Sequence, residues 1–444
     1  MRRRSGIGRT LLKYIISCLL TVTAMAAHAQ VSAPVDSLRE DSLRAKSLKA
    51  QKPTENLTKQ YDIGNLIHTV LYPHKKVDPT HHGSGIVVVP NVAANPTIGL
   101  QGGIKAVAGK KLGDDPNTLF SVAATSASVT TKGIISFYIN HNVFTPGNKW
   151  NLQGNLSASK SVLPDYGLGI GRDYIGKGGA DSVLADPTHK AYAINSFYFV
   201  AREKVYKQVA KNLFVGAGLS MEFRTDIKNK DTVTDATPSS VYNNEHGFPQ
   251  DHYTSVGFLF NVEYTTRDNP NRAYRGFYFD AGVRINQTWI GSTKDAVQVT
   301  SDIRKYVSLS ATHPELVLAF WNWGSYLLDG AIPYLELPGT AKDGSFRSGR
   351  GYTTQYFKST KFNDTEAELR YPITKNNFLS GVVFGNLQTG NDQQGTKLFQ
   401  VFQPGYGAGL RVLFNKYTRT NLALDYAFGR FGNKGFFLNL NEAF

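Results

Sequence analysis

From residue 84 onward, apolar and polar side chains alternate in segments of about ten residues, the length and period of transmembrane β-strands. In 276–286, apolar residues alternate with mostly polar ones: Phe277, Phe279, Ala281, Val283 and Ile285 against Tyr278, Asp280, Gly282, Arg284 and Asn286. Segments 150–160 and 422–428 show the same alternation. A soluble β-sandwich also alternates, but it would not place Asp, Arg and Asn on its inner face. The pattern therefore predicts a barrel whose apolar face meets lipid and whose polar face lines a lumen.

Sixteen such segments are expected, the first at 84–91 and the last at 434–444. Counted from the first strand, the long connections all fall at odd-numbered positions: 161–189, 225–253, 326–361 and 389–403. An even strand number, long extracellular loops and short periplasmic turns are typical of bacterial outer-membrane barrels. The predicted fold class is all-β, a transmembrane antiparallel β-barrel of 16 strands. The composition agrees, because 42 Gly, 23 Tyr and 26 Phe with 3 Met are typical of strands and tight turns.

The first 29 residues have the features of a secretory signal peptide. A basic start precedes an apolar run at 14–27, and Ala27-His28-Ala29 fits the cleavage site. An anchor helix is the alternative, but the run is short for one. Cys18, the single cysteine, also lies in a loose match to a lipoprotein processing box. Cleavage would remove five of the positive charges and leave +10 from the total of +15.

Residues 30–83 are polar and charged, which predicts a periplasmic tether. The segment 61–72 (YDIGNLIHTVLY) is more apolar and is expected to form a short helix at the periplasmic mouth of the barrel. The expected organisation is a signal peptide at 1–29, the tether at 30–83 and an outer-membrane barrel at 84–444.

The last expected strand carries aromatic and aliphatic residues in one register, namely Phe436, Leu438, Leu440 and Phe444. An amphipathic strand that ends in an aromatic residue is the signal that outer-membrane assembly machinery typically reads. The strand of a soluble protein can also end in Phe. Together with the signal peptide and the alternation, this end indicates the bacterial outer membrane.

The long segment 341–373 (AKDGSFRSGRGYTTQYFKSTKFNDTEAELRYPI) begins as a polar, glycine-rich loop and ends as an alternating strand. Long irregular loops are usually functional or disordered. In the strand part, alternation directs Glu366, Glu368 and Arg370 inward, and the same parity directs Asp425 inward. We expect the loop to fold back into the barrel lumen.

Several motifs in the C-terminal two-thirds resemble, in order, the barrel of the BamA/TamA superfamily (bacterial surface antigen domain). They are YTTRDN at 264–269 with Gly276, IPYLEL at 332–337 with Gly339, Arg350-Gly351-Tyr352, ELRYPI at 368–373, GYGAGLR at 405–411 and 435–444. Residues 89–103 resemble the first hairpin of the family more loosely. The family's assembly factors carry periplasmic POTRA domains before the barrel. This chain has no room for them, so it resembles a barrel-only branch.

The resemblance implies that Arg350, at the tip of the sixth loop with Gly351 and Tyr352, binds carboxylates on the inner wall, with Glu366, Glu368 and Asp425 as candidates. A carboxylate can grip a guanidinium bidentately. The plain alternative is a solvated loop arginine. Where the family commonly has an acid on the next strand, this chain has Asn386, so the usual second partner of the arginine is neutral.

Other motifs indicate little. The glycines at 167–171 lack the context of a dinucleotide site, and His74, His81 and His82 lie in a polar linker. Trp321 and Trp323 are expected in an interfacial aromatic girdle. No catalytic constellation stands out, so we expect a protein that is not an enzyme and has no metal or other cofactor.

The resemblance favours a factor that helps polypeptides or lipids into or across the outer membrane, by strand addition at a weak seam between 84–91 and 434–444. A passive small-solute pore and a structural surface-antigen barrel are the alternatives. Expected partners are outer-membrane lipids, unfolded outer-membrane proteins and periplasmic or lipoprotein partners, with no sign of nucleic-acid binding.

Overall fold

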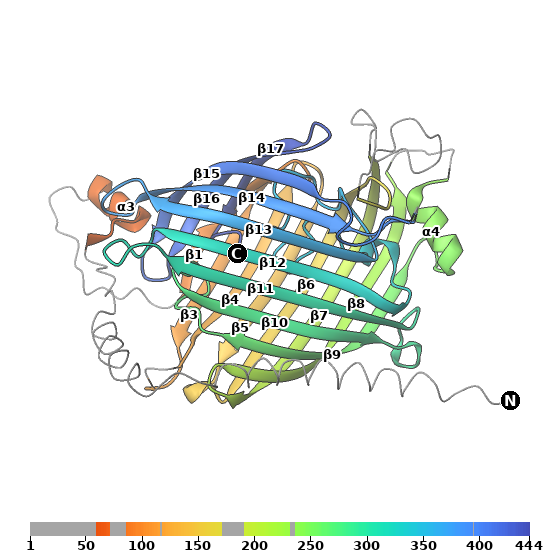
Figure 1. Cartoon of the computed structure of the whole chain (residues 1–444), viewed down its shortest axis with the longest axis horizontal. Coiled ribbons are helices and arrows are strands. Elements are labelled where there is room, and N and C mark those ends of the chain that lie inside the picture. Colours follow the sequence, from red (N-terminus) through yellow and green to blue (C-terminus); the bar gives the residue numbers. More distant parts are fainter. Residues whose placement is uncertain (1–58, 72–85, 116–117, 171–190, 231–235, 394) are drawn as a thin grey trace, which may run out of the picture. The chain divides into compact units, whose positions relative to one another are not determined.

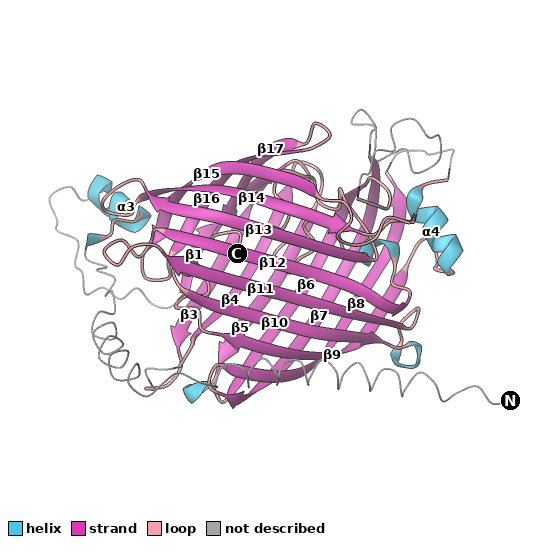
Figure 2. Cartoon of the chain, in the orientation of Figure 1, coloured by secondary structure: helices cyan, strands magenta, loops and turns pink. Residues whose placement is uncertain are grey.

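The computed structural model describes residues 59–71, 86–115, 118–170, 191–230, 236–393 and 395–444. The expected signal peptide and most of the expected tether lie outside these residues. The described part is almost entirely β-structure, with a few short helices (Figure 2). None of the helices in these ranges has the length and apolar character needed to cross a membrane.

The strands form one antiparallel sheet that closes on itself (Figure 1). They are β1 (Ile86–Pro90), β2 (Ala93–Asn95), β3 (Gly99–Lys111), β4 (Phe120–Thr130), β5 (Ile135–Phe144), β6 (Trp150–Asp165), β7 (Tyr192–Ala210), β8 (Leu213–Asn229), β9 (Tyr253–Thr265), β10 (Gly276–Asn286), β11 (Ala296–Ser308), β12 (Val317–Gly330), β13 (Lys361–Pro372), β14 (Leu379–Gly390), β15 (Gln403–Asn415), β16 (Thr420–Gly429) and β17 (Lys434–Leu440). The short helices are α3 (Ile63–Leu71), α4 (Pro238–His246), η3 (Pro146–Asn148), η5 (Thr288–Ile290) and η6 (Tyr334–Glu336).

The first two labelled strands are halves of one interrupted strand. Both pair with β3 in the same register, Pro90 opposite Ile104 in β1 and Ala93 opposite Gln101 in β2. The described barrel therefore has 16 spanning strands, which confirms the predicted fold class.

The barrel closes between β2 and β17, where the ladder is short. Within the described residues the two strands share one register pair, Leu438 opposite Ala94. On its other side, β17 pairs with β16 along its full length, from Leu440 to Lys434. The closing pair therefore lies in β2, a segment beyond the predicted first strand at 84–91. We call this junction the seam.

The short helices occur at both ends of the barrel (Figure 1). At the end with short turns, Asp62 accepts from the backbone N–H of Asn65 (2.9 Å) at the start of α3, and Tyr61 donates its backbone N–H to the carbonyl of Asn376 (3.0 Å). At the end with long loops, the hydroxyl of Tyr242 in α4 donates to the carbonyl of Ile332 (3.0 Å). The expected helix in 61–72 is thus present and contacts the turns that strand parity predicts to be periplasmic.

Two tryptophans of β12 correct the predicted aromatic girdle. Trp321 lies opposite Glu366 and Trp323 opposite Asp364 in the β12–β13 ladder, so both rings share the face of the acids. Both are buried in an apolar cluster with Tyr352. Both faces of this strand are apolar, so alternation alone did not show which one faces lipid.

Candidate functional site

The connection between β12 and β13, residues 331–360, is the sixth on the end of the barrel with long loops, and we call it loop L6. The turn at residues 343–348 of this loop is braced by Asp343. The buried carboxylate of Asp343 accepts hydrogen bonds from the backbone N–H groups of Ser345 (2.9 Å), Arg347 (2.8 Å) and Ser348 (2.8 Å). A carboxylate shared by three backbone donors fixes the conformation of a turn. This turn therefore holds the residues that follow it in place.

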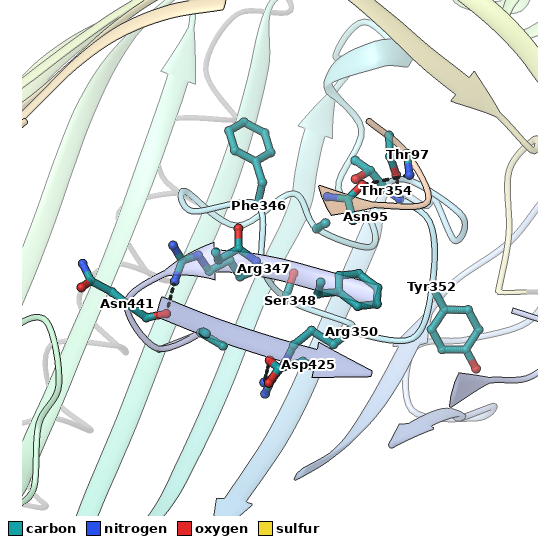
Figure 3. A pocket seen from close by; sticks show the side chains of 15 residues that line it. Asn95, Thr97, Phe346, Arg347, Ser348, Arg350, Tyr352, Thr354, Asp425 and Asn441 are labelled. Carbon is teal, nitrogen blue, oxygen red and sulfur yellow. Dashed lines mark hydrogen bonds and ion pairs between the residues drawn. The ribbon is translucent and has the colours of Figure 1, made fainter. Parts of the chain in front are cut away.

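Arg350 lies inside the barrel and contacts three carboxylates. Its Nη2 is 3.0 Å from Glu366 and also bonds Glu368. Its Nη1 is 2.9 Å from Asp425 (Figure 3). The guanidinium also lies 3.7 Å from the ring centroid of Phe384. Arg350 is 4% exposed, so these contacts replace its hydration.

The electrostatics of Arg350 follow from these neighbours. Burial alone would lower the pKa of its guanidinium, but the carboxylates of Glu368, Glu366 and Asp425 raise that pKa well above its ordinary value. Arg350 is thus a permanent cation in a carboxylate cage. These contacts hold the loop in one position. They need not add to the free energy of unfolding, because the cost of removing the charged groups from water opposes their attraction.

The cage continues into a closed ring of alternating charge. Its successive members are Arg350, Glu368, Arg370, Glu442, Arg411 and Asp425. The pairs away from Arg350 include Arg370–Glu368 at 2.7 Å, Arg411–Glu442 at 2.6 Å and Arg411–Asp425 at 2.5 Å. The ring joins L6 to β13, β15, β16 and the residues after β17.

Gly351 and Tyr352 complete the loop tip. Gly351 has φ of 109°, and a Cβ on it would lie 2.6 Å from the carbonyl oxygen of Phe428. Glycine is therefore required by both the backbone conformation and the close approach to β16. The hydroxyl of Tyr352 donates to the carbonyl of Pro404 (2.5 Å) and accepts from the backbone N–H of Arg430 (2.9 Å). Burial raises the pKa of Tyr352 to about 12, so it remains a phenol that can donate.

Asn386 contacts the loop through its backbone. Its Nδ2 donates to the carbonyl oxygen of Arg350 (2.8 Å), and no bond to the guanidinium is present among the described residues. Asp425 lies beside the guanidinium instead. Asn386, which stands where the resemblance led us to expect an acid, therefore binds the main chain of Arg350 and not its guanidinium.

The upper part of L6 is held by a second set of contacts that sequence reasoning missed. Tyr334 and Lys358 both bond Asp165 of β6, at 2.6 and 3.1 Å. Glu336 lies 3.3 Å from Arg284 of β10. No periodic signal marks these residues, because loop residues carry no alternation and their partners lie far away in the sequence. Tyr334 and Asp165 are 169 positions apart, and Lys358 and Asp165 are 193 positions apart.

The residues of the expected assembly signal do not share one environment. Phe436 is 56% exposed on the outer face, Leu438 is half-buried and Leu440 is buried. The predicted strand to residue 444 is wrong, because β17 ends at Leu440. Asn441 follows with φ of 70°, a left-handed conformation that turns the chain away from the sheet. Phe444 is consequently buried, not part of the lipid-facing row.

The structure gives no support to candidate metal or nucleotide sites within the described residues. His74, His81 and His82 lie outside the described residues. The described part of the glycine-rich segment is a barrel loop, in which Gly169 forms an isolated bridge with Lys358. Within the described ranges, no three His, Cys, Asp or Glu side chains are grouped so that they could hold a metal ion.

The barrel and its buried sixth loop define an outer-membrane β-barrel with a loop-filled lumen. A family model described as the Omp85 superfamily domain matches residues 116–443. The chain belongs to the Omp85 superfamily, which confirms the resemblance drawn from the motifs and implies the bacterial outer membrane.

Solved structures share the fold. BamA from Haemophilus ducreyi lacking POTRA domains 1–3 is similar with a TM-score of 0.53 and 14% identity, over 81% of this chain and 70% of that chain. CdiB from Escherichia coli is similar with a TM-score of 0.52 and 8% identity, over 81% of this chain and 63% of that chain. The chain thus spans less than two thirds of that CdiB, and identities this low show the fold alone. No curated protein matches the chain.

Proposed function

We propose that the protein helps polypeptides, or lipids, to insert into or cross the outer membrane, and that it does so by strand addition at the seam. A signal peptide at 1–29 would export it to that membrane. The observation that carries the proposal is that β2 and β17 share one register pair within the described part of the chain, Leu438 opposite Ala94.

A short closing ladder leaves strand edges without partners inside the sheet. Unpaired backbone N–H and C=O groups of an edge are a template for another extended chain. Pro90 adds to this effect, since proline supplies no N–H to a ladder. An incoming strand at the seam therefore displaces few existing hydrogen bonds.

The comparisons support the proposal at the level of the superfamily, because BamA and CdiB share the barrel. We propose that a separate periplasmic or lipoprotein partner works together with the barrel. The turns that contact α3, which include Asn376, are where such a partner would meet the barrel.

The alternatives are a passive pore and a structural surface-antigen barrel. Against a wide pore, L6 places the buried rings of Tyr352, Tyr356 and Phe357 inside the barrel. Planar-bilayer recordings separate these functions, because a large steady conductance in the wild-type protein would favour the pore.

The seam can be locked to test the proposal. In the variant Ala94→Cys/Leu438→Cys the two sulfurs belong to directly opposed residues, a geometry that permits a disulfide. The matched control is Val283→Cys/Val299→Cys, an opposed pair of β10 and β11 on the barrel wall. Cys18, the natural cysteine, lies in the expected signal peptide.

The assay is the folding rate of an unfolded outer-membrane barrel protein added to vesicles that contain each variant. We expect oxidation of the seam pair to abolish the acceleration and reduction to restore it, while the control pair has no effect. Undiminished acceleration by a fully oxidised seam would refute strand addition there. An outer-membrane proteome that does not change on depletion of the protein would count against the assembly role as a whole.

A further inference from the structure

Residues 441–444 leave the sheet and lie in the lumen, where elements other than β17 surround them. Asn441 donates the last ladder bond to the carbonyl of Asn421 (2.7 Å) and then turns the chain inward. Glu442, Ala443 and Phe444 are all buried. The surroundings of these residues have the features of a peptide-binding site.

The main chain of this segment is held by Arg347 from the braced turn of L6. The guanidinium of Arg347 donates to the carbonyl oxygen of Asn441 (3.2 Å; Figure 3). It also donates to the carbonyl oxygens of Leu440 (2.6 Å) and Glu442. Any polypeptide supplies backbone carbonyls, so this part of the contact is independent of side chains.

An acidic side chain is held next. The carboxylate of Glu442 accepts from Nε of Arg411 (2.6 Å) and from Nδ2 of Asn421 (3.0 Å), and it lies 3.3 Å from Nε of Arg272. All three partners are buried and come from β15, β16 and the turn before β10. Buried arginines without an acid between them would be strongly destabilised. The position therefore selects a carboxylate.

An aromatic side chain is held two positions further on. The ring of Phe444 lies 5.2 Å from that of Trp321 and 6.3 Å from that of Tyr306. Arg370 donates from Nη2 to the carbonyl oxygen of Phe444 (2.8 Å) and lies 5.3 Å from its ring. Aromatic walls with a cation at the rim suit an aromatic residue of an extended peptide.

Space remains beside the segment. A cavity of about 20 Å³ lies between L6 and the chain end, and its lining includes Arg347, Asn441 and Ala443. Asn95 and Thr97, next to the seam, line it as well (Figure 3). The surroundings of 441–444 are thus continuous with the place where the barrel closes.

We propose that this part of the lumen is a binding site for an extended polypeptide with an acidic residue two positions before an aromatic one, and that residues 441–444 occupy it in cis. The proposal rests on the proposed function for the source of the ligand, an unfolded client of the barrel. The chain's own segment then acts as a competitor that a client must displace.

The test uses a defined probe, a fluorescent, acetylated and amidated peptide with the sequence of residues 438–444, LNLNEAF. The variant Glu442→Ala/Phe444→Ala frees both side-chain positions. We expect it to bind the peptide saturably in fluorescence anisotropy, whereas the wild-type protein binds at least about ten-fold more weakly because its own segment competes at high effective concentration. Peptides with glutamine for the glutamate, or alanine for the phenylalanine, should each lose about ten-fold or more in affinity.

A change in the site itself provides the second measurement. Adding Arg272→Gln to the emptied variant should weaken the normal peptide and leave the glutamine peptide unaffected, because Arg272 acts on the carboxylate. Folding of each variant is checked by its different gel migration when boiled and unboiled.

A folded, emptied variant that binds no peptide, or binds all three peptides equally, would overturn the inference. The same holds if Arg272→Gln weakens all peptides alike, which would indicate a structural role. Because peptide binding is measured without a client, failure here with an intact effect of the seam lock would leave the proposed function standing.

Discussion

Replacing Arg350 with alanine is the most direct perturbation of L6. The substitution would remove the cation that is shared by Glu366, Glu368 and Asp425. The three carboxylates differ in the partners that they keep. Glu368 retains Arg370 at 2.7 Å, and Asp425 retains Arg411, as the ring of charges shows. Glu366 keeps the backbone N–H of Gly349 at 2.8 Å. The uncompensated buried charge in the variant is therefore that of Glu366.

The size of the effect follows from that assignment. Removing one partner of a buried ion pair typically costs about 3–5 kcal/mol. Most of this cost comes from the carboxylate of Glu366, which remains buried without a cation. Replacing it with a neutral amide in Arg350→Ala/Glu366→Gln should therefore recover about 1–3 kcal/mol of the lost free energy of unfolding. Arg350→Lys keeps the charge but not the fork of donors, so it should lie between wild type and alanine.

Two measurements report on the loop and the barrel. The urea midpoint at which unboiled protein loses its folded gel migration reports stability, and trypsin cleavage at Lys342, Arg347 and Lys358 reports release of L6. We expect Arg350→Ala to lower the midpoint and expose these sites, and the double variant to reverse part of both. The control is Arg275→Ala, an exposed arginine in the turn before β10, which should change stability by less than about 0.5 kcal/mol. Equal midpoints and equal cleavage in wild type and Arg350→Ala would refute the anchoring role.

Three further predictions concern the same loop. Asn386→Asp should destabilise the barrel by about 1–3 kcal/mol in the urea assay, because it removes the donor to the carbonyl of Arg350 and adds an acid beside the cage; a stabilised variant would contradict this. Gly351→Ala should raise trypsin sensitivity as much as Arg350→Ala, since its Cβ would clash with the carbonyl of Phe428, whereas Gly344→Ala, where a Cβ meets nothing within 4 Å, should behave as wild type. Burial raises the pKa of Glu336 from 4.5 to about 7, and the nearby carboxylate of Glu222 in β8 adds to this rise. A group whose pKa is higher in the folded than in the unfolded protein stabilises the fold below its unfolded-state pKa, and this contribution is lost as the pH rises. The wild-type protein should therefore lose stability relative to Glu336→Gln between pH 5 and 8. Parallel curves of stability against pH for the two proteins would show the reasoning to be wrong.

The sequence was sufficient for the parts of the barrel that repeat. Alternation gave the spanning strands, and it directed Glu366, Glu368 and Asp425 to the face where the structure has them, because a period of two fixes the side of every second residue. The motif Arg350-Gly351-Tyr352 added which loop residue reaches them. Each of these predictions depends on local periodicity or on a motif within one segment, which is why the sequence alone could support it.

The rest of the site depends on single residues that break the period. Asn441 adopts a left-handed conformation, and this turn alone removes Glu442 and Phe444 from the sheet and puts them in the lumen. Alternation would have continued the strand through them. Once Glu442 is inside, Arg411 and Arg370 acquire their roles in the ring, and neither role follows from the segments that contain them. The signal in the sequence is Asn441 itself, an asparagine directly before Glu442, because asparagine adopts the left-handed conformation more readily than most residues.

The structure also shows how a seam with one ladder pair is held closed. L6 contacts the first hairpin, where Thr354 donates its backbone N–H to the hydroxyl of Thr97 (2.8 Å). It contacts the other side through Arg350 to Asp425 of β16 and through Arg347 to the carbonyl of Leu440 in β17. The loop thus bridges the junction from inside, where side-chain contacts replace ladder bonds that the strands do not make. If a client strand enters at the seam, it competes mainly with L6. Loss of Arg350 should then weaken closure of the seam as well as free the loop, which links the anchored arginine at the loop tip to the weakly joined seam.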